Sequence, residues 1–323
     1  MEFNRTTIRT LSILGQRGAF GTALTEIAKE DPRIIALTAD LCTTSGLERF
    51  NAAFPERLIN VGIAEQNMIG IAAGLSTLGN IPFATTFANF ASLRSCEQMR
   101  HFMGYMQENI KIVGFGGGFA MGMFGITHYG IEDIASIRSI ANLTILSPAD
   151  GLATAKATIA AARHPGPVFL RLTGVMNQPI IYKNDFEFAI GKSIQLQDGS
   201  DIAIFATGGM VNQALLAAKT LADQGLTCRV VDMHTIKPID AEAIQAALDM
   251  RLIVAVEEHS VMGGLGSAIA EILSGLNRQP PLLRIGVPND YRPAGSYEYM
   301  LEQYELTHPH ISKKILERVK ELN

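Results

Sequence analysis

The sequence has few cysteines, no excess of basic side chains and no long apolar run, and each shortage excludes a class of protein. Its three cysteines, Cys42, Cys96 and Cys228, lie far apart and form no CxxC pair, so neither a zinc site nor a disulfide framework is indicated. With 27 basic and 31 acidic side chains, the net charge of −4 argues against a nucleic-acid-binding face. No stretch approaches the ~18 apolar residues of a membrane span, and the N-terminus lacks the apolar core of a signal peptide. We therefore expect a reduced, soluble, cytoplasmic protein without nucleic-acid or membrane partners.

Common motifs of nucleotide binding and catalysis are also missing. Neither GxGxxG nor GxxxxGK[ST] occurs. The absence of GxSxG and HExxH leaves serine hydrolase and zinc peptidase functions without support, and we expect no metal ligands in this chain. The glycine-rich run at 114–125, GFGGGFAMGMFG, fits none of these spacings. It is either a flexible loop or a place where the backbone comes close to a ligand.

What the sequence does contain is a regular alternation of short β-rich runs and longer helical patterns. In the first half, strands are predicted at 33–40, 57–63, 81–87, 109–115, 142–148 and 167–172, and helices at 19–30, 64–78, 92–106, 130–141 and 150–164. An irregular segment at 174–201 follows, and the second half then repeats the pattern with four strands and three helices. The sequence therefore predicts an α/β fold of two doubly wound domains, at 1–188 and 189–323, with the crossover at about 174–201.

One carboxylate, Glu65, stands between an apolar strand-like run and a helix-like run that is apolar almost all the way round. Ionisable side chains are seldom fully buried without a partner, so its surroundings are informative. Glu65 is either an exposed carboxylate at a helix start, favoured there by the helix dipole, or a carboxyl in a dry site that disfavours its charged form. A carboxyl group of the second kind can hold or donate a proton at neutral pH, as general acid–base catalysis requires.

Three further features have both a structural and a functional interpretation. His128 precedes a predicted helix and follows the glycine-rich run, where loop residues often carry function, although a lone histidine is usually structural. Arg171 interrupts an apolar strand near its carboxyl end, where open α/β sheets bind ligands and where an arginine suits an anionic group. The segment 257–273, EEHSVMGGLGSAIAEIL, is either a nucleotide site or a tight turn into helix–sheet packing.

Eight segments, taken in order, carry a resemblance to a known family. They are TADL (38–41), INVGIAEQNMIGIAAGL (59–75), TTFANF (85–90), GITHYGIEDIASIR (125–138), LSPAD (146–150), FLRLTG (169–174), DMHTIKPID (232–240) and EEHSVMGGLGSA (257–268). Together they resemble the C-terminal two-thirds of transketolase, which comprises its pyrimidine-binding and C-terminal domains. The matching part of deoxyxylulose-phosphate synthase is similar as well. The resemblance spans essentially the whole chain and implies a transferase of carbohydrate metabolism.

The resemblance implies a cofactor and the residues that hold it. In this family the glutamate at the position of Glu65 hydrogen-bonds N1′ of the aminopyrimidine of thiamine diphosphate, and the proton shared there starts catalysis. The aromatic residues at the positions of Phe87 and Phe90 line the aminopyrimidine and stack on it, and stacking holds a ring in place. Asp40 resembles an acid that lies close to the thiazolium.

The resemblance also implies residues that hold the sugar substrate. Arg17, Thr44 or Ser45, and Arg171 match residues that bind the terminal phosphate of the sugar. His128 matches a histidine that contacts substrate hydroxyls near the reaction centre, so it counts with Glu65 as a catalytic candidate.

The sequence departs from the family pattern in what it lacks. The motif that holds the cofactor's diphosphate and Mg²⁺, GDG followed by an asparagine, lies in an N-terminal domain of the family and is absent here. We therefore expect a split enzyme in which a separate subunit supplies the diphosphate and metal site. Neither half alone should be active, and an α₂β₂ heterotetramer is the expected assembly because closed two-fold symmetry is the usual solution.

Two substitutions concern the sugar. Phe124, in GMFGITH, replaces an aspartate that senses a sugar hydroxyl in many relatives, and Gly116 stands where transketolase has a histidine that helps bind phosphate. Because each buried hydroxyl needs its own polar partner, such a site should discriminate differently among sugars. The expected donor is a specialised ketose phosphate of branched, deoxy or sulfonated type, and an aldose such as glyceraldehyde 3-phosphate is the expected acceptor.

Two other functions remain open at this point. The β subunit of the first component of a 2-oxo acid dehydrogenase has similar length and architecture, although its glycine-loop segment does not resemble GITHYGIEDIASIR. A non-catalytic partner-binding relative would keep the fold without the chemistry. The presence of Glu65, Phe87, Phe90 and His128 counts against the second alternative.

Overall fold

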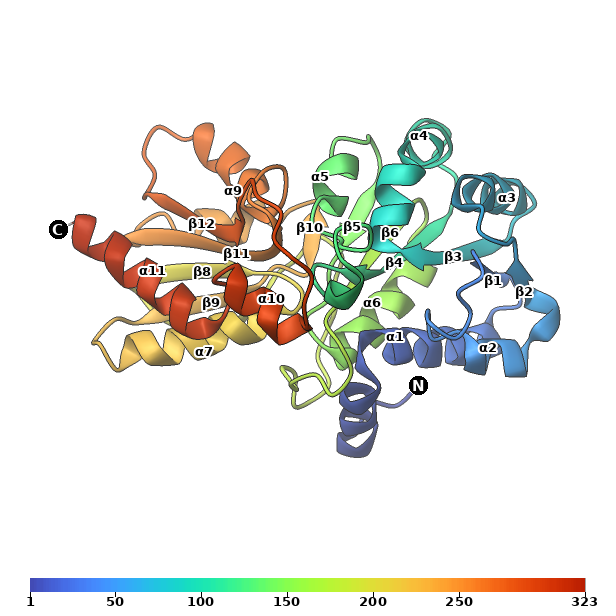
Figure 1. The fold of residues 1–323 in the computed structure, drawn as a ribbon, viewed down its shortest axis with the longest axis horizontal. Coiled ribbons are helices and arrows are strands. Elements are labelled where there is room, and N and C mark those ends of the chain that lie inside the picture. The colour runs from blue at the N-terminus through green and yellow to red at the C-terminus, as the bar shows by residue number, and fades with distance from the viewer. Residues whose placement is uncertain (323) are drawn as a thin grey trace.

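The computed structural model describes residues 1–322, whose strands form two sheets, one in each half of the molecule (Figure 1). From edge to edge, the larger sheet consists of β10 (Thr235–Lys237), β5 (Thr144–Leu146), β6 (Val168–Thr173), β4 (Lys111–Gly117), β3 (Ile81–Phe87), β1 (Ile34–Thr38) and β2 (Leu58–Asn60). The smaller consists of β12 (Leu282–Val287), β11 (Leu252–Ser260), β8 (Ile202–Ala206), β9 (Cys228–Asp232) and β7 (Ile194–Gln197). Only the edge strands β10 and β7 pair antiparallel to their neighbours within the described chain.

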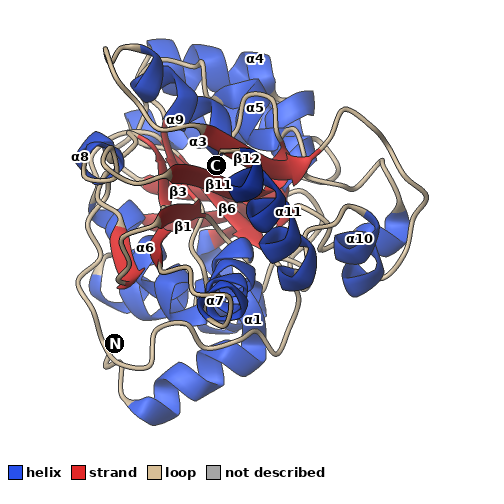
Figure 2. Cartoon of the chain, turned by 90° about the vertical axis from the view of Figure 1, so that its left-hand side faces the viewer, coloured by secondary structure: helices blue, strands red, loops and turns tan. Residues whose placement is uncertain are grey.

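Helices cover both faces of the sheets, which leaves the strands between two helical layers (Figure 2). One layer contains α3 (Glu65–Thr77), the π-helical turns η2 (Phe90–Arg94) and η3 (Met99–Tyr105) around α4 (Cys96–Gln98), α5 (Asp133–Ile137), α8 (Ala241–Gln245) and α9 (Leu265–Ser274). The other contains α1 (Arg5–Glu30), α6 (Gly151–Arg163), α7 (Met210–Ala222) and α11 (His308–Glu321). Short elements complete the chain: α2 (Glu48–Ala53), η1 (Pro55–Arg57), η4 (Gly122–Phe124) and α10 (Tyr297–Gln303).

Strands covered on both faces should be apolar along their whole length, and this is what the central strands show. All residues of β3, β4, β6, β8 and β11 are buried. The apolar core is also continuous between the halves, because one cluster includes Ile69 and Ile145 from the first half and Phe205 and Ile253 from the second. The two units therefore share a core rather than being joined only by the chain.

The predicted α/β fold with two doubly wound units is confirmed, and the differences are local. Helix α1 begins at Arg5, well before the predicted 19, because the Asn4 side chain caps it and a break at Gly15 interrupts its pattern. The helix predicted at 92–106 is mostly π-helical. The end of the predicted crossover forms β7, and the helices α10 and α11 were not predicted.

Strand β10 bears on the predicted boundary between the domains. It lies in the second half of the sequence, yet it pairs with β5 of the first sheet, with Thr235 opposite Leu146. Sheet membership therefore does not divide the chain cleanly at 188/189, and that boundary stays a prediction.

The buried Arg171 side chain ties the two halves together. The Arg171 Nε lies 2.6 Å from an Asp133 carboxylate oxygen, and both side chains are almost completely buried. The same guanidinium donates to the carbonyl oxygen of Gly130 and to that of Glu258 on β11, in the second sheet. His259 beside it is neutral, since burial lowers its pKa to about 4, and its Nε2 accepts from the Ala135 N–H.

The first half of the glycine-rich run packs against this interface. The Glu258 carboxylate accepts a hydrogen bond from the Phe119 N–H at 2.5 Å and another from the Tyr297 hydroxyl at 2.9 Å. A Cβ atom on Gly118 would lie 2.2 Å from the same carboxylate, and Gly118 has a φ of +67°. Of the two interpretations offered for this run, neither fits its first half: glycine here permits close packing within the chain.

The segment 257–273 is a tight turn into helix–sheet packing. The buried Glu257 carboxylate accepts hydrogen bonds from the Leu265 N–H at 2.7 Å and from the Gly266 N–H at 2.8 Å. These are the free amides at the start of α9, to which a phosphate would otherwise bind. The nucleotide-site interpretation therefore has no support in the structure.

We predict that Arg171→Ala destabilises the protein by about 3–5 kcal/mol, because it leaves the buried Asp133 charge without its partner. Arg33→Ala, which breaks the exposed pair with Asp31, is the matched control and should cost at most about 1 kcal/mol. Urea unfolding followed by circular dichroism measures both. Equal losses in the two variants would show that the buried pair contributes no more stability than an exposed one.

Candidate functional site

The predicted cofactor-binding residues and His128 follow the carboxyl ends of four strands, β4, β3, β1 and β2, which are neighbours in the larger sheet (Figure 1). This edge is where open α/β sheets bind ligands. Asp40 follows β1, Glu65 follows β2, Phe87 and Phe90 end and follow β3, and His128 lies in the loop after β4. The parallel sheet therefore brings together residues that are far apart in the sequence.

Glu65 is the first residue of α3 and only 2% of its surface is exposed. Between the two interpretations of this residue, the structure supports the buried carboxyl and excludes the solvent-exposed helix start. Its Oε1 lies 2.7 Å from Nη1 of Arg94. Because a buried carboxylate without a partner is costly, this ion pair is what allows Glu65 to stay inside.

Arg94 is a residue that the sequence reasoning missed. It ends the π-helical turn η2, and π-helical turns are frequent at functional sites. Its guanidinium carbon lies 4.0 Å from the centre of the Phe90 ring, so the charged group covers an aromatic face while it reaches Glu65. The available signal was its position one helical turn after Phe90, but only the fold shows that this turn faces Glu65.

An aromatic cluster surrounds His128. Its imidazole lies 5.2 Å from the Phe87 ring, 5.4 Å from Phe90 and 5.1 Å from Phe124, measured between ring centres. Burial, and after it the charge of Arg94, lowers the pKa of His128 below its usual value, so the ring is neutral at pH 7. A neutral imidazole has one acceptor and one donor, and its Nδ1 lies 2.9 Å from the Thr127 hydroxyl.

Asp40 is held by a second residue that the sequence reasoning missed, Asn60. Asp40 has a φ of +61°, a conformation that few residues other than glycine adopt. The Asn60 side chain donates to the Asp40 carboxylate and accepts from the backbone N–H groups of Asp40 and Gly62, each at 3.0 Å. One amide thus fixes two loops at the edge of the site and presents the exposed Asp40 carboxylate to solvent.

The predicted phosphate-binding residues do not form one cluster. Arg17 donates to the backbone oxygen of Thr44 at 2.8 Å, so these two residues are neighbours. Ser45 is buried, and its hydroxyl donates to the backbone oxygen of Cys42. Arg171 lies apart in the buried interface described above, where its partners are Asp133 and two carbonyl oxygens. A phosphate-binding role for Arg171 stays a prediction, and its geometry gives that role no support.

Gly116 is fixed by packing as well. Its φ is +73°, and a Cβ atom there would lie 2.9 Å from Cγ of Met121 and 3.3 Å from the Phe87 ring. A histidine side chain at this position would therefore meet Met121 and an aromatic residue of the site. The packing of this loop therefore explains why glycine stands here in place of a phosphate-binding histidine.

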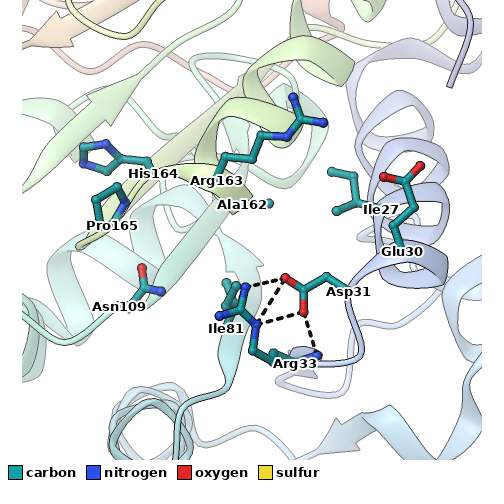
Figure 3. Close-up of a pocket in the computed structure, with 10 residues that line it drawn as sticks. All are labelled: Ile27, Glu30, Asp31, Arg33, Ile81, Asn109, Ala162, Arg163, His164 and Pro165. Carbon is teal, nitrogen blue, oxygen red and sulfur yellow. Dashed lines mark hydrogen bonds and ion pairs between the residues drawn. The ribbon is translucent and has the colours of Figure 1, made fainter.

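A cavity of about 660 Å³ lies at a different edge of the larger sheet (Figure 3). It lies beside the starts of β1, β3 and β4, and Asp31, Arg33, Asn109 and His164 are among its lining residues. Asp31 and Arg33 pair with each other there. None of the ten residues that line it belongs to the predicted site, so its size is no argument for function.

Metal clusters and membrane-spanning helices are both missing from the described part of the chain. Within residues 1–322, no three His, Cys, Asp or Glu side chains are grouped so that they could hold a metal ion. None of the helices in this range has both the length and the apolar character needed to cross a bilayer.

The geometry fits a planar, nitrogen-rich heterocycle. In this structure the planar Arg94 guanidinium lies between Oε1 of Glu65 and the face of the Phe90 ring. The aminopyrimidine expected from the resemblance has this shape. Glu65 would hold or move a proton at Oε1, while Phe87 and Phe90 would hold the ring by stacking.

Two family models match consecutive parts of the chain. Residues 14–174 match the pyrimidine-binding domain of transketolase, and residues 191–311 match the transketolase C-terminal domain. The two matches together cover most of the chain.

Two relatives of similar length carry the word subunit in their names, and a third is a longer synthase. The 6-deoxy-6-sulfo-D-fructose transketolase subunit SqwH of Clostridium sp. is 42% identical over 90% of this chain and 90% of its own length. A subunit of the apulose-4-phosphate transketolase of Phocaeicola vulgatus is 38% identical over 96% of this chain and 99% of its own. The 1-deoxy-D-xylulose-5-phosphate synthase of Syntrophotalea carbinolica is 33% identical over 90% of this chain, which matches 46% of that longer protein.

A solved structure shows the same architecture. A split-gene transketolase, solved as an inactive β4 tetramer, is 41% identical and superposes with a TM-score of 0.85. The superposition covers 94% of this chain and 97% of the other.

We predict that Phe124→Ala raises the pKa of His128 toward its ordinary value, because it removes an aromatic ring that keeps water from the imidazolium. An NMR titration of the histidine side chains measures the change. Met123→Ala, which removes an exposed side chain from the same loop, is the control and should leave the titration unchanged. A lower or unaltered value in Phe124→Ala would contradict the assignment of burial as the main cause.

Proposed function

Since the chain belongs to the transketolase family, we propose that it is the pyrimidine-binding subunit of a heteromeric, thiamine-diphosphate-dependent transketolase. The observation that carries the proposal is the buried Glu65 carboxyl, paired with an N–H donor that lies over Phe90. A buried carboxyl beside an aromatic face is what a glutamate needs if it is to share a proton with a stacked aminopyrimidine, which would take the place of the present donor. Thiamine diphosphate, once bound, would serve as the electron sink for a two-carbon ketol unit.

The proposal assigns one role to each residue at the carboxyl edge. Glu65 holds the proton shared with the cofactor, and Phe87 and Phe90 stack on the pyrimidine. Asp40, presented by Asn60, lies toward the thiazolium. His128 meets substrate hydroxyls as a neutral imidazole, able to donate or accept.

Phosphate binding is assigned more narrowly than the sequence suggested. Arg17 and Thr44 are neighbours at the same edge, and Arg17 is the positively charged candidate for the sugar phosphate. Ser45 contributes through the backbone of this loop, because its own hydroxyl is bonded within the chain. Arg171 is left out of the proposal.

A partner subunit is part of the same proposal. Two relatives that match this chain over nearly their whole length carry subunit names. A second chain would hold the diphosphate and Mg²⁺, and an α₂β₂ complex would place the cofactor between subunits. The chain alone is expected to be inactive and cytoplasmic.

The donor is proposed to be a specialised ketose phosphate or sulfonate. The exposed Phe124 ring, next to His128, offers no hydrogen bond to a sugar hydroxyl. The relatives named for sulfofructose and apulose 4-phosphate are consistent with such a donor. Glyceraldehyde 3-phosphate is the proposed acceptor.

We predict that Glu65→Gln lowers ketol transfer at least about 10²-fold, because the amide cannot take up the proton that the carboxyl holds. The assay uses the chain co-purified with a partner that carries the GDG…N motif, and gel filtration checks that the complex still forms. Glu97→Gln, the same substitution at an exposed position, is the control and should leave the rate unchanged. A wild-type rate in Glu65→Gln would refute the catalytic role. Oxidation of a 2-oxo acid by the wild-type complex with ferricyanide would favour the dehydrogenase alternative.

We also predict that the wild-type complex turns over 6-deoxy-6-sulfofructose or apulose 4-phosphate faster than xylulose 5-phosphate, with glyceraldehyde 3-phosphate as acceptor. Phe124→Asp should shift this preference toward xylulose 5-phosphate by about tenfold, because it restores a polar partner for a hydroxyl. Values of kcat/KM for each donor measure the shift, and Met123→Asp is the control. Equal turnover of all donors would remove the basis for a specialised substrate.

A further inference from the structure

The Arg94 guanidinium makes both contacts that the site would make with the cofactor's pyrimidine ring. It is planar, its central carbon lies 4.0 Å from the centre of the Phe90 ring, and its Nη1 lies 2.7 Å from Oε1 of Glu65. We propose that Arg94 is a positioning residue that occupies the place of the aminopyrimidine in the cofactor-free chain and leaves it when the cofactor binds. The inference rests on the proposed function, and it adds to that function a residue and an exchange step.

The surroundings of Arg94 allow the side chain to move while the backbone stays. Its backbone oxygen accepts a hydrogen bond from the Gln66 side chain at 3.0 Å, which ties η2 to α3. The Arg94 side chain is 44% exposed, whereas the Glu65 side chain is 3% exposed. The guanidinium can therefore turn into water, but Glu65 has no such route and must keep a partner.

The exchange has a consequence for protons. A carboxylate is only an acceptor, and Arg94 supplies the N–H that it now binds. A ring nitrogen with a free lone pair, such as N1′, is an acceptor too, so the two can share a hydrogen bond only after one proton has been added. Glu65 Oε1 therefore takes up one proton from water when Arg94 leaves, and Arg94 keeps all of its own.

A purely structural ion pair and an Arg94 that holds the place of the ring predict different changes in cofactor affinity when Arg94 is removed. If Arg94 stayed on Glu65 in the loaded enzyme, its removal would weaken the cofactor site or leave it unchanged. If Arg94 holds the place of the ring, its removal abolishes a contact that the cofactor has to break, and affinity rises. The sign of the change thus separates the two roles.

The test uses isothermal titration calorimetry, with excess Mg²⁺, to measure thiamine diphosphate binding to the complex of this chain and its partner. Arg94→Ala and Arg94→Gln should bind the cofactor roughly tenfold more tightly than wild type, within the range seen for coupled neighbours. Arg100→Ala is the control, because Arg100 is an exposed arginine on η3 that pairs with Glu97. Arg94→Gln keeps a polar side chain in case Arg94→Ala does not fold. Titrations of wild type in two buffers of different ionisation enthalpy should show uptake of about one proton.

The proposal requires both results, so equal or weaker binding by the Arg94 variants, or binding by wild type without proton uptake, overturns it. Wild-type complex that does not bind the cofactor at all refutes the proposed function and this inference together. Thermal unfolding of the cofactor-free chain is a second readout. Arg94→Ala should lower the Tm more than Arg100→Ala. When each substitution is combined with Glu65→Gln, the two should lower the Tm equally.

Discussion

The buried Glu65 carboxylate imposes the constraint on which the site depends. A charged group that is almost wholly inside the protein must be paired, and the chain provides that pair from a neighbouring π-helical turn. The same Arg94 covers the Phe90 ring, is anchored through its backbone by Gln66, and contributes to lowering the pKa of His128. Glu65 is thus already paired in the free chain, and a ligand that binds to it has to displace Arg94.

The parallel sheet explains why these residues meet. Each of the four strands ends at one edge, and the loop or helix that follows delivers one group: Asp40, Glu65, Phe90 or His128. All four groups come from the first half of the chain, and the buried acids of β11 in the second half serve packing. The Glu257 carboxylate accepts hydrogen bonds from the first N–H groups of α9, and the Glu258 carboxylate accepts one from the Phe119 N–H. The same sheet architecture therefore carries a ligand site in one half and packing in the other.

Sequence reasoning predicted the strands and singled out Glu65, without deciding between its two interpretations, because both features appear in local patterns. Apolar runs of strand length mark buried strands, and a single acid between two such runs marks a constrained carboxyl. Contacts between distant segments leave no such pattern. Arg94 and Asn60 were not singled out from the sequence, and Arg171 was expected to bind an anion, whereas the fold places it beside Asp133. The glycine run was interpreted as mobile or ligand-facing, whereas Gly118 is required by a carboxylate from the other sheet. The resemblance supplied roles for residues, but it could not show which of them are already engaged within the chain.

Strand β10 has a consequence for how such proteins can be divided. Residues 235–237 lie late in the sequence, yet they cover the side of β5 that would otherwise be the open edge of the first sheet. An uncovered edge is a template for aggregation. A gene broken between the two halves would therefore produce a first half whose β5 edge is exposed and prone to aggregate. The two halves are better regarded as one evolutionary unit, which can be separated from other domains but not divided.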